Sequence, residues 1–127
     1  MGEGLLALVG VGRGDGPEQA TELAQKLVHL RVFLDEGGRM NRSLIDTGGG
    51  LGVVSQFTLF GDARHGRRPS YADAAPPEQA EPLIRAVVEA ASVAGVSVIT
   101  GRFRAMMDVE LVNAGPVTIL LDTDRVF

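Results

Sequence analysis

Three polar side chains interrupt the apolar segment Val53–Phe60, and they are the first candidates for chemistry in this sequence. If the segment is a strand, alternation places Gln56 and Thr58 together on one face. Ser55 and Phe57 then lie on the other face. Buried polar groups need hydrogen-bond partners, so these groups are either satisfied within the protein or face a ligand. Thr58 is the nucleophile by residue type, but a threonine without a nearby base is weak, so we expect it to position rather than attack.

A glycine–proline pair in front of an apolar segment is the second candidate. Gly115-Pro116 is separated from Asn113 by one residue, Ala114, and precedes Val117. Proline is acceptable at the first residue of a strand, and glycine permits unusual backbone angles. Because only about 5–6% of X–Pro bonds in folded proteins are cis, an ordinary hairpin turn is the default interpretation from these residues alone.

Other kinds of chemistry are poorly supplied. The chain has two histidines and no cysteine, which excludes disulfides, thiolate metal clusters and a cysteine nucleophile. It also lacks an H-x-x-x-H pair or a dense carboxylate cluster, so we expect no metal and no cofactor. The glycines of Gly10–Gly16 follow a predicted strand, but their spacing does not match a nucleotide-binding loop, and we interpret them as a turn.

Charge and hydropathy limit the partners. With 12 Lys and Arg against 16 Asp and Glu, the net charge is −4. Broad wrapping of a nucleic acid is not expected, because it requires many phosphates to be neutralised, whereas contact with one nucleic-acid end is still allowed. The apolar stretches are far shorter than the roughly 20 residues of a membrane helix, so no membrane partner is expected. The absence of cysteine fits a reducing cytoplasm.

Two helices and several strands would position these candidates. Helical spacing of apolar residues predicts one helix that begins at Pro17 and a second over residues 77–93. Apolar runs predict strands over residues 5–9, 31–35, 51–60, 96–100, 107–112 and 117–122, the last two joined as a hairpin. A polar loop over residues 61–77 carries Arg64, Arg67 and Arg68. We therefore predict a single α+β domain over residues 1–127, with a largely antiparallel or mixed sheet packed against two helices.

Taken together, these motifs resemble one known family. Ser55-Gln56-x-Thr58 followed by Asn113-x-Gly115-Pro116-Val117-Thr118 closely resembles the D-aminoacyl-tRNA deacylase (D-Tyr-tRNA deacylase) family. The other matching stretches are Lys26–Phe33, Met40-Asn41-x-Ser43-Leu44, Gly66-Arg67-Arg68-Pro69-Ser70 and Ala74-Ala75-Pro76-Pro77. The resemblance extends from Gly4 to Asp122, and its motifs are specific because unrelated stretches occur in the family's order and spacing.

The resemblance implies hydrolysis of the ester that joins a D-amino acid, or glycine, to the terminal adenosine of tRNA. It also implies a homodimer with active sites at the subunit interface, where a cis Gly115-Pro116 bond enters the partner's site. Main-chain carbonyls there would accept the substrate's ammonium group and occupy the space that an L side chain needs. Selection of this kind works by exclusion.

The resemblance also assigns roles to single residues. Peptide N–H groups of Phe57 and Thr58 would stabilise the oxyanion, while Ser55 and Gln56 would hold the adenosine and the strand geometry. The 2′-hydroxyl of that adenosine would help to position or activate water. The resemblance further places Asn113 beside the glycine–proline turn and Met107 in the pocket lining. Phosphate contacts at Arg64, Arg67 and Arg68, or a merely solvated loop, are the two alternatives for the basic residues.

One departure from the family concerns the start of the chain. Family members begin with two further strands, and Met1–Gly4 aligns just before the third, so we expect a misplaced start or a shortened sequence rather than a naturally minimal enzyme. Loss of those strands would expose a strand edge. The alternative function is therefore a catalytically weak remnant that dimerises or binds tRNA ends, and a small-molecule sensing domain is the third.

Overall fold

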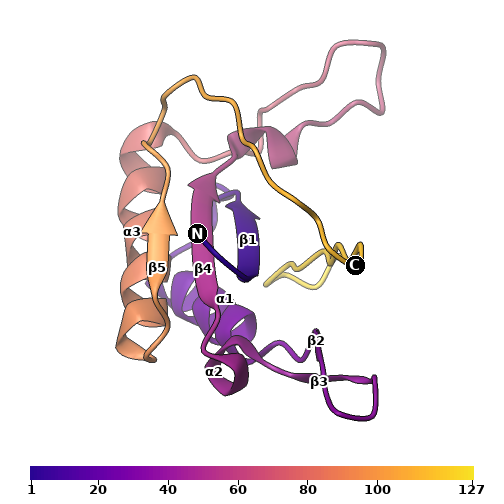
Figure 1. Ribbon diagram of the computed structural model, residues 1–127. Coiled ribbons are helices and arrows are strands. Elements are labelled where there is room, and N and C mark those ends of the chain that lie inside the picture. The colour runs from indigo at the N-terminus through magenta and orange to yellow at the C-terminus, as the bar shows by residue number, and fades with distance from the viewer.

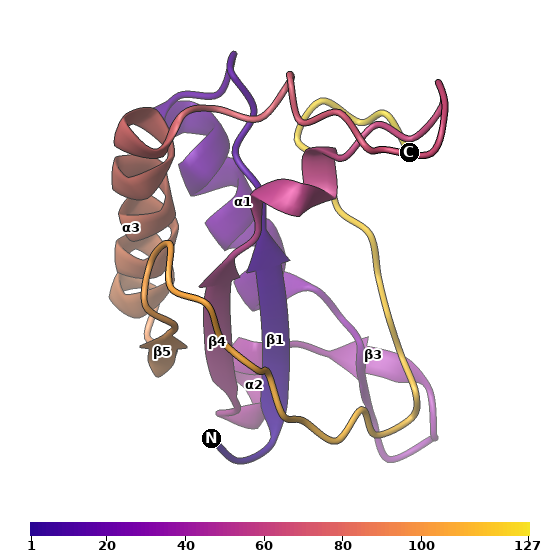
Figure 2. The same cartoon turned by 90° about the horizontal axis from the view of Figure 1, so that it is seen from above.

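The computed structural model describes residues 1–127, and its centre is a three-stranded parallel sheet in the order β1-β4-β5. Strand β1 (Gly4–Val9) pairs with β4 (Gly50–Ser55), and β4 pairs with β5 (Val98–Thr100). Each connection passes through a long helix, α1 (Pro17–His29) or α3 (Pro77–Val93). The two helices pack against each other on one face of the sheet (Figures 1 and 2). This is the arrangement that helical crossovers between parallel strands require.

The core lies between this sheet and the two helices. Alternate strand residues point into it, and Leu51 and Val53 at the centre of β4 are buried almost completely. The apolar stripes of the two helices cover them, as the helical spacing predicts. The deepest helix residues are Ala24, Val28, Val87 and Ala91.

A smaller unit projects from the sheet. Strands β2 (Phe33–Leu34) and β3 (Met40–Arg42) pair antiparallel, and helix α2 (Leu44–Thr47) follows them. The Ser43 hydroxyl accepts a hydrogen bond from the Asp46 amide at 3.2 Å, and the Asp46 carboxylate accepts one from the Ser43 amide at 2.9 Å. This reciprocal cap starts the helix and lowers the pKa of Asp46. The sequence analysis identified neither β3 nor α2.

The α+β class is confirmed, and pairing across the two sheets is mixed. A largely antiparallel sheet is wrong for the larger sheet, in which both pairs of strands are parallel. The reason is its connections, because strands joined through helices run in the same direction. The helix predicted over residues 77–93 matches α3.

The strand predicted over residues 51–60 is too long. Strand β4 ends at Ser55, and residues Phe57–Phe60 form a single 3-10 turn, η1. The alternation of faces therefore stops at Ser55, and the predicted sharing of one face by Gln56 and Thr58 as strand residues is wrong. Local backbone bonding replaces the ladder here, because the Leu59 amide donates to the Gln56 carbonyl at 3.3 Å.

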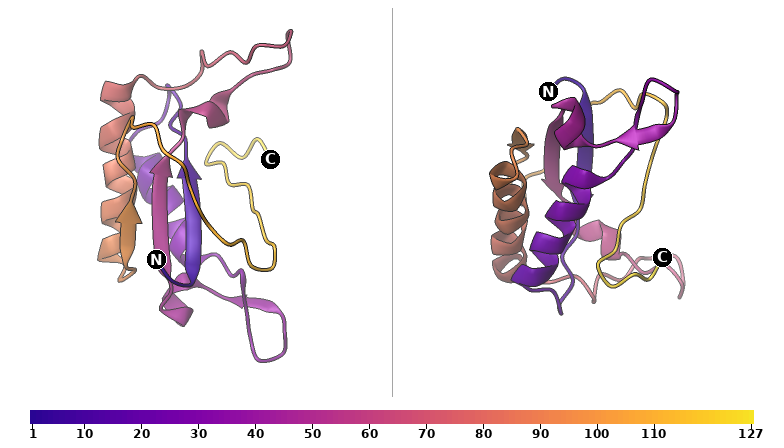
Figure 3. Two further views of the ribbon diagram at one scale, coloured as in Figure 1. Left: turned by 45° about the horizontal axis from the view of Figure 1, so that its top comes forward. Right: turned by 90° about the horizontal axis from the view of Figure 1, so that it is seen from below.

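The hairpin predicted over residues 107–122 is absent. This segment has no strand (Figure 3). Most of its apolar side chains are exposed. The peptide bond between Gly115 and Pro116 is trans, so the predicted cis bond is wrong for this structure. A strand requires a neighbour for its N–H and C=O groups, and no strand of the chain pairs with residues 107–122. Local side-chain bonds occur instead, such as that from the Val117 amide to Asn113 Oδ1 at 3.3 Å.

Candidate active site at the carboxyl edge of the sheet

Two loops meet where β1 and β4 end. The Gln56 amide donates to the Val9 carbonyl at 2.8 Å, which continues the ladder one residue beyond β4. The Phe60 ring then lies over the loop after β1, because a Cβ on Gly10 or Gly12 would lie 3.0 Å or 3.2 Å from its carbon atoms. The carboxyl edge of a parallel sheet is where ligands bind in open α/β sheets. Here it is formed by η1 and the glycine loop.

The start of η1 presents free peptide donors. The backbone amides of Phe57 and Thr58 donate no hydrogen bond to another backbone group in the loops and caps of the chain. This is expected for the first residues of a helix. Both amides therefore remain available to an oxygen atom that develops negative charge. The peptide groups after them are engaged, since the Gly61 amide donates to the Thr58 carbonyl at 2.9 Å.

The polar side chains around these donors are uncharged. Gln56 donates from Nε2 to the hydroxyl of Thr58. No histidine or carboxylate bonds to that hydroxyl, so it lacks the base that a threonine nucleophile needs. Ser55, half-buried at the end of β4, pairs with Val9 through its backbone. These residues can position a substrate and polarise its carbonyl group, but they do not supply a nucleophile.

The basic loop is closed by a short antiparallel bridge between Asp62 and Ser70, with amide-to-carbonyl distances of 2.7 Å and 2.8 Å. Arg64 donates to the Asp62 carboxylate from Nε at 2.8 Å and from Nη2 at 2.7 Å. These bonds lower the pKa of Asp62 to about 2. Arg67 and Arg68 are exposed and make no ion pair. Of the three arginines, these two keep their charge available to a partner.

A pair of aromatic rings stands beside η1. Phe57 and Tyr71 meet edge to face, with ring centroids 5.1 Å apart and planes at 70°. Phe57 is 56% exposed and Tyr71 is 38% exposed, although large apolar rings are usually covered. The sequence analysis did not identify Tyr71 or Phe60 as site residues. For Phe60 the only signal in the sequence was the glycine loop after the first strand, which leaves room for its ring and which we interpreted as a turn.

The residues predicted from the carboxyl-terminal part of the chain are separated from this edge, with one exception. Met107 lies against the end of β4, since a Cβ on Gly101 would be 3.3 Å from Met107 Cε and 3.7 Å from Val54 Cγ2. Asn113 bonds only within residues 113–118, through Val117 and Thr118. Gly115 and Pro116 are exposed in the same segment. Within one chain the structure therefore places Met107 near Val54, directly before Ser55–Thr58, and shows no contact of the glycine–proline turn with those residues.

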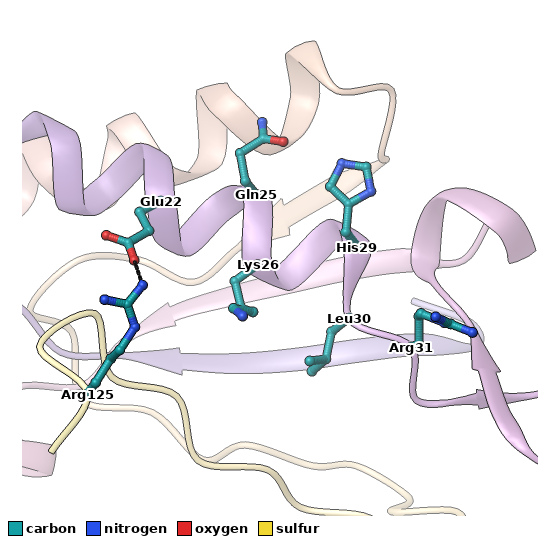
Figure 4. A pocket seen from close by; sticks show the side chains of 7 residues that line it. All are labelled: Glu22, Gln25, Lys26, His29, Leu30, Arg31 and Arg125. Atoms are coloured by element: carbon teal, nitrogen blue, oxygen red, sulfur yellow. Dashed lines mark hydrogen bonds and ion pairs between the residues drawn. The ribbon is translucent and has the colours of Figure 1, made fainter. Parts of the chain in front are cut away.

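A shallow pocket along α1 is lined by none of the predicted site residues; Figure 4 shows the side chains that line it. Glu22 pairs there with Arg125 at 3.4 Å, and Arg31 donates to Asn41. Lys26 and His29 occupy the last turn of α1, where positive charge favours the helix dipole. These contacts and positions account for the charged residues of the pocket without a ligand. No group of three or more His, Asp or Glu side chains is arranged to hold a metal ion.

Comparison with known proteins identifies the family of this chain. A family model described as D-Tyr-tRNA(Tyr) deacylase matches residues 1–122. The chain therefore belongs to this family, whose named members are hydrolases of aminoacyl-tRNA esters. The D-aminoacyl-tRNA deacylase of Roseiflexus sp. (strain RS-1) is 58% identical over 123 residues, or 97% of this chain and 79% of the relative. That of Thermomicrobium roseum is 57% identical over 123 residues, or 97% of this chain and 80% of the relative.

Solved structures show the same fold. The c-Myc DNA Unwinding Element Binding Protein superimposes with a TM-score of 0.90 and 34% identity, covering 96% of this chain and 83% of the other. A probable eukaryotic D-amino acid tRNA deacylase superimposes with a TM-score of 0.61 and 16% identity, covering 80% and 74%. The second match is evidence of fold alone. No helix of the chain is both long enough and apolar enough to cross a membrane.

Proposed function

We propose that this chain hydrolyses the ester between a D-amino acid, or glycine, and the 3′-terminal adenosine of tRNA, releasing the free amino acid and tRNA. The observation that carries the proposal is the pair of free peptide donors at Phe57 and Thr58, beside the Gln56 amide, in a member of the deacylase family. We further propose a cytoplasmic location, where translation uses charged tRNA.

The reaction needs no protein nucleophile. Water adds to the ester carbonyl carbon, and the carbonyl oxygen takes up negative charge opposite the two amides. The intermediate then breaks its bond to the ribose oxygen, which leaves with the proton that water supplied. In other hydrolases one such donor lowers the barrier by about 2.7–4 kcal/mol. The neighbouring 2′-hydroxyl of the adenosine helps to position water, while Ser55 and Gln56 hold the nucleoside.

A comparison of the two mirror-image substrates tests the proposal. The protein is incubated with matched D- and L-aminoacyl-tRNA, and loss of the ester is measured with time. We expect the D ester to be hydrolysed and the L ester to be spared. Hydrolysis of neither ester argues against an enzyme, and equal hydrolysis of both argues against chiral selection.

Thr58 provides a test of the mechanism. Thr58→Ala removes the hydroxyl but keeps the peptide donor, so we expect less than a tenfold loss in kcat. A nucleophile would cost several orders of magnitude when removed. A loss of that size for Thr58→Ala, with Thr58→Ser active, contradicts the positioning role.

We assign chiral selection to the Gly115–Pro116 segment of a second subunit, because within one chain this segment does not bond to the site. The main chain of the segment would fill the volume that an L side chain needs and would accept the substrate's ammonium group. Asn113 would hold the turn, as it does here through Val117. The role proposed is exclusion by main-chain atoms, without the cis bond that the structure contradicts.

A homodimer is proposed because the second face of the sheet is apolar and partly exposed. Leu6, Leu8 and Ile99 are 38%, 46% and 51% exposed on this face, opposite the two helices. Exposed apolar patches of this kind mark interfaces. Arg67 and Arg68 are proposed to contact tRNA phosphates at the rim of the site.

The alternative function is a module that dimerises or binds tRNA ends without hydrolysis. The observation in its favour is that one structural relative is named as a DNA-element-binding protein. The two functions separate in one experiment, because a binding module retains charged D-aminoacyl-tRNA on a filter without releasing the amino acid.

A further inference from the structure

The exposed rings of Phe57 and Tyr71 have no role in the reaction described above. Their edge-to-face contact, with centroids 5.1 Å apart, is a stable arrangement, yet both rings keep a large exposed area. The Tyr71 hydroxyl makes no hydrogen bond within the chain, so its ring is not held there by a polar contact. An aromatic surface open to solvent is suited to bind another flat ring.

The backbone on both sides of the pair is fixed. Phe57 is the first residue of η1, and Tyr71 directly follows the bridge between Ser70 and Asp62. The turn after Tyr71 is closed by the Ala74 amide, which donates to its carbonyl at 3.1 Å. Gly61 allows the close approach, because a Cβ there would lie 3.1 Å from Tyr71 Cε1. The backbone that carries the two rings is therefore fixed before any ligand arrives, which lowers the entropic cost of binding.

The charges around the pair indicate the chemical class of the ligand. Arg67 and Arg68 lie on the loop that ends at Tyr71, and the charge of Asp62 is neutralised by Arg64. Aromatic rings combined with basic side chains are how proteins bind single-stranded nucleic acid, with a base on the ring and phosphates near the cations. An apolar peptide would not use the two arginines.

We propose that Phe57 and Tyr71 form a stacking platform for one unpaired base at the 3′ end of the RNA substrate. The inference rests on the proposed function for its substrate and adds a base-binding surface to it. The platform adjoins the peptide donors of Phe57 and Thr58, so a base stacked there places its own or the next ribose near the reacting ester.

The composition of the chain provides a specific signal. Tyr71 is the only tyrosine and the chain has no tryptophan, so tyrosine fluorescence reports on this platform alone. The protein is titrated with adenosine 5′-monophosphate, with ribose 5-phosphate as the base-free probe and free tyrosine as the control for light absorption. We expect saturable quenching by the nucleotide and none by the sugar phosphate. Equal responses to both probes, or no saturable quenching, overturn the platform.

Variants locate the binding site by calorimetry with the same nucleotide. Phe57→Leu and Tyr71→Leu are each expected to weaken binding about tenfold, while Tyr71→Phe binds like the wild type because stacking needs the ring and not the hydroxyl. Phe127→Leu is the matched control, since Phe127 is an exposed phenylalanine (69%) at the far end of the chain. Thermal unfolding of each variant checks that it is folded.

The outcomes separate the platform from the proposed hydrolysis, because adenosine 5′-monophosphate carries no ester to the amino acid. Nucleotide binding that depends on the two rings supports the platform even if D-aminoacyl-tRNA is not hydrolysed. If the wild type hydrolyses D-aminoacyl-tRNA but Tyr71→Leu binds the nucleotide as Phe127→Leu does, the platform is wrong and the proposed function stands.

Discussion

Replacement of Gly10 by alanine tests how η1 is held at the candidate site. The new Cβ would lie 3.0 Å from Phe60 Cε2 and 3.2 Å from the Gln56 carbonyl oxygen. The contact with Phe60 would displace the ring that anchors η1. The contact with Gln56 would displace the residue directly before η1. The backbone at Gly10 is not left-handed, so the whole effect arises from this contact and not from backbone strain.

The magnitude follows from two opposing terms. Insertion of a methyl group into a packed site costs about 1–3 kcal/mol. Replacement of glycine by alanine returns about 0.4–1 kcal/mol, because the unfolded chain loses conformational freedom. We expect Gly10→Ala to lower the free energy of unfolding by about 1–2 kcal/mol. Because a displacement of about 1 Å can cost 100-fold in rate, a smaller shift of the Phe57 and Thr58 donors should lower kcat about tenfold.

Gly14→Ala is the matched control, since nothing lies within 4 Å of a Cβ at Gly14 in the same loop. Its free energy of unfolding should be unchanged or higher by up to about 1 kcal/mol. Urea unfolding and hydrolysis of D-aminoacyl-tRNA are measured for both variants under conditions that keep Gly10→Ala folded. Equal stability and equal kcat for the two variants would refute the argument that Phe60 rests on the glycine loop.

Three further predictions concern other parts of the chain. In Arg64→Ala the pKa of Asp62 should rise from about 2 toward 3.8, measured by NMR titration of the carboxyl carbon. The wild-type contribution of this carboxylate to stability is present above about pH 4 and lost as the pH falls toward 2, so an unchanged titration in the variant contradicts the pairing. Ser43→Ala should lower the free energy of unfolding by about 0.5–2 kcal/mol, because the hydroxyl caps α2, and urea unfolding tests this against Ser43→Thr as the retained cap. Leu8→Asp should shift sedimentation equilibrium from dimer toward monomer, and a dimer of unchanged strength would show that this sheet face is not the interface.

Much of the fold could be predicted from residue patterns. The bounds of α3 match the predicted helix because apolar residues recur at helical spacing and Pro77 opens its first turn. The strand before the glycine loop was also predicted, since Leu5–Val9 is a short apolar run followed by Gly10. Such patterns show which face of a helix or strand is buried, and the spacing of apolar residues within one element is enough to determine it.

The direction of pairing and the end of β4 could not be predicted in the same way. A short apolar segment has the same residue pattern in a parallel pair of strands as in an antiparallel pair. The direction of pairing follows only from the helices that connect the strands. At Phe57–Phe60 the apolar residues continue, but the ring of Phe60 is covered by the glycine loop from another part of the chain. In the candidate site, Ser55–Thr58 could be predicted because polar residues interrupt an apolar run. Tyr71 could not be predicted, because only its contact with Phe57 in the folded chain identifies it.

The segment over residues 107–122 shows the limit of a local pattern. Its alternation of apolar and polar residues favours strands, and yet no partner strand pairs with it within the chain. A strand is a property of two segments, because its hydrogen bonds go to a neighbour. A sequence pattern describes only one of them.

The strand order has a consequence for how this chain folds as it is synthesised. Strand β4 is central, and its partner β1 precedes it in the chain, with Gly4 pairing to Gly50. Strand β1 therefore leaves the ribosome before β4 and lacks this partner until α1, β2, β3 and α2 have followed. Pairings between strands that are distant in sequence slow folding and prolong the exposure of apolar, aggregation-prone segments. We expect β1 in the nascent chain to be a binding site for chaperones, and the glycine loop after it to stay disordered until Phe60 has emerged.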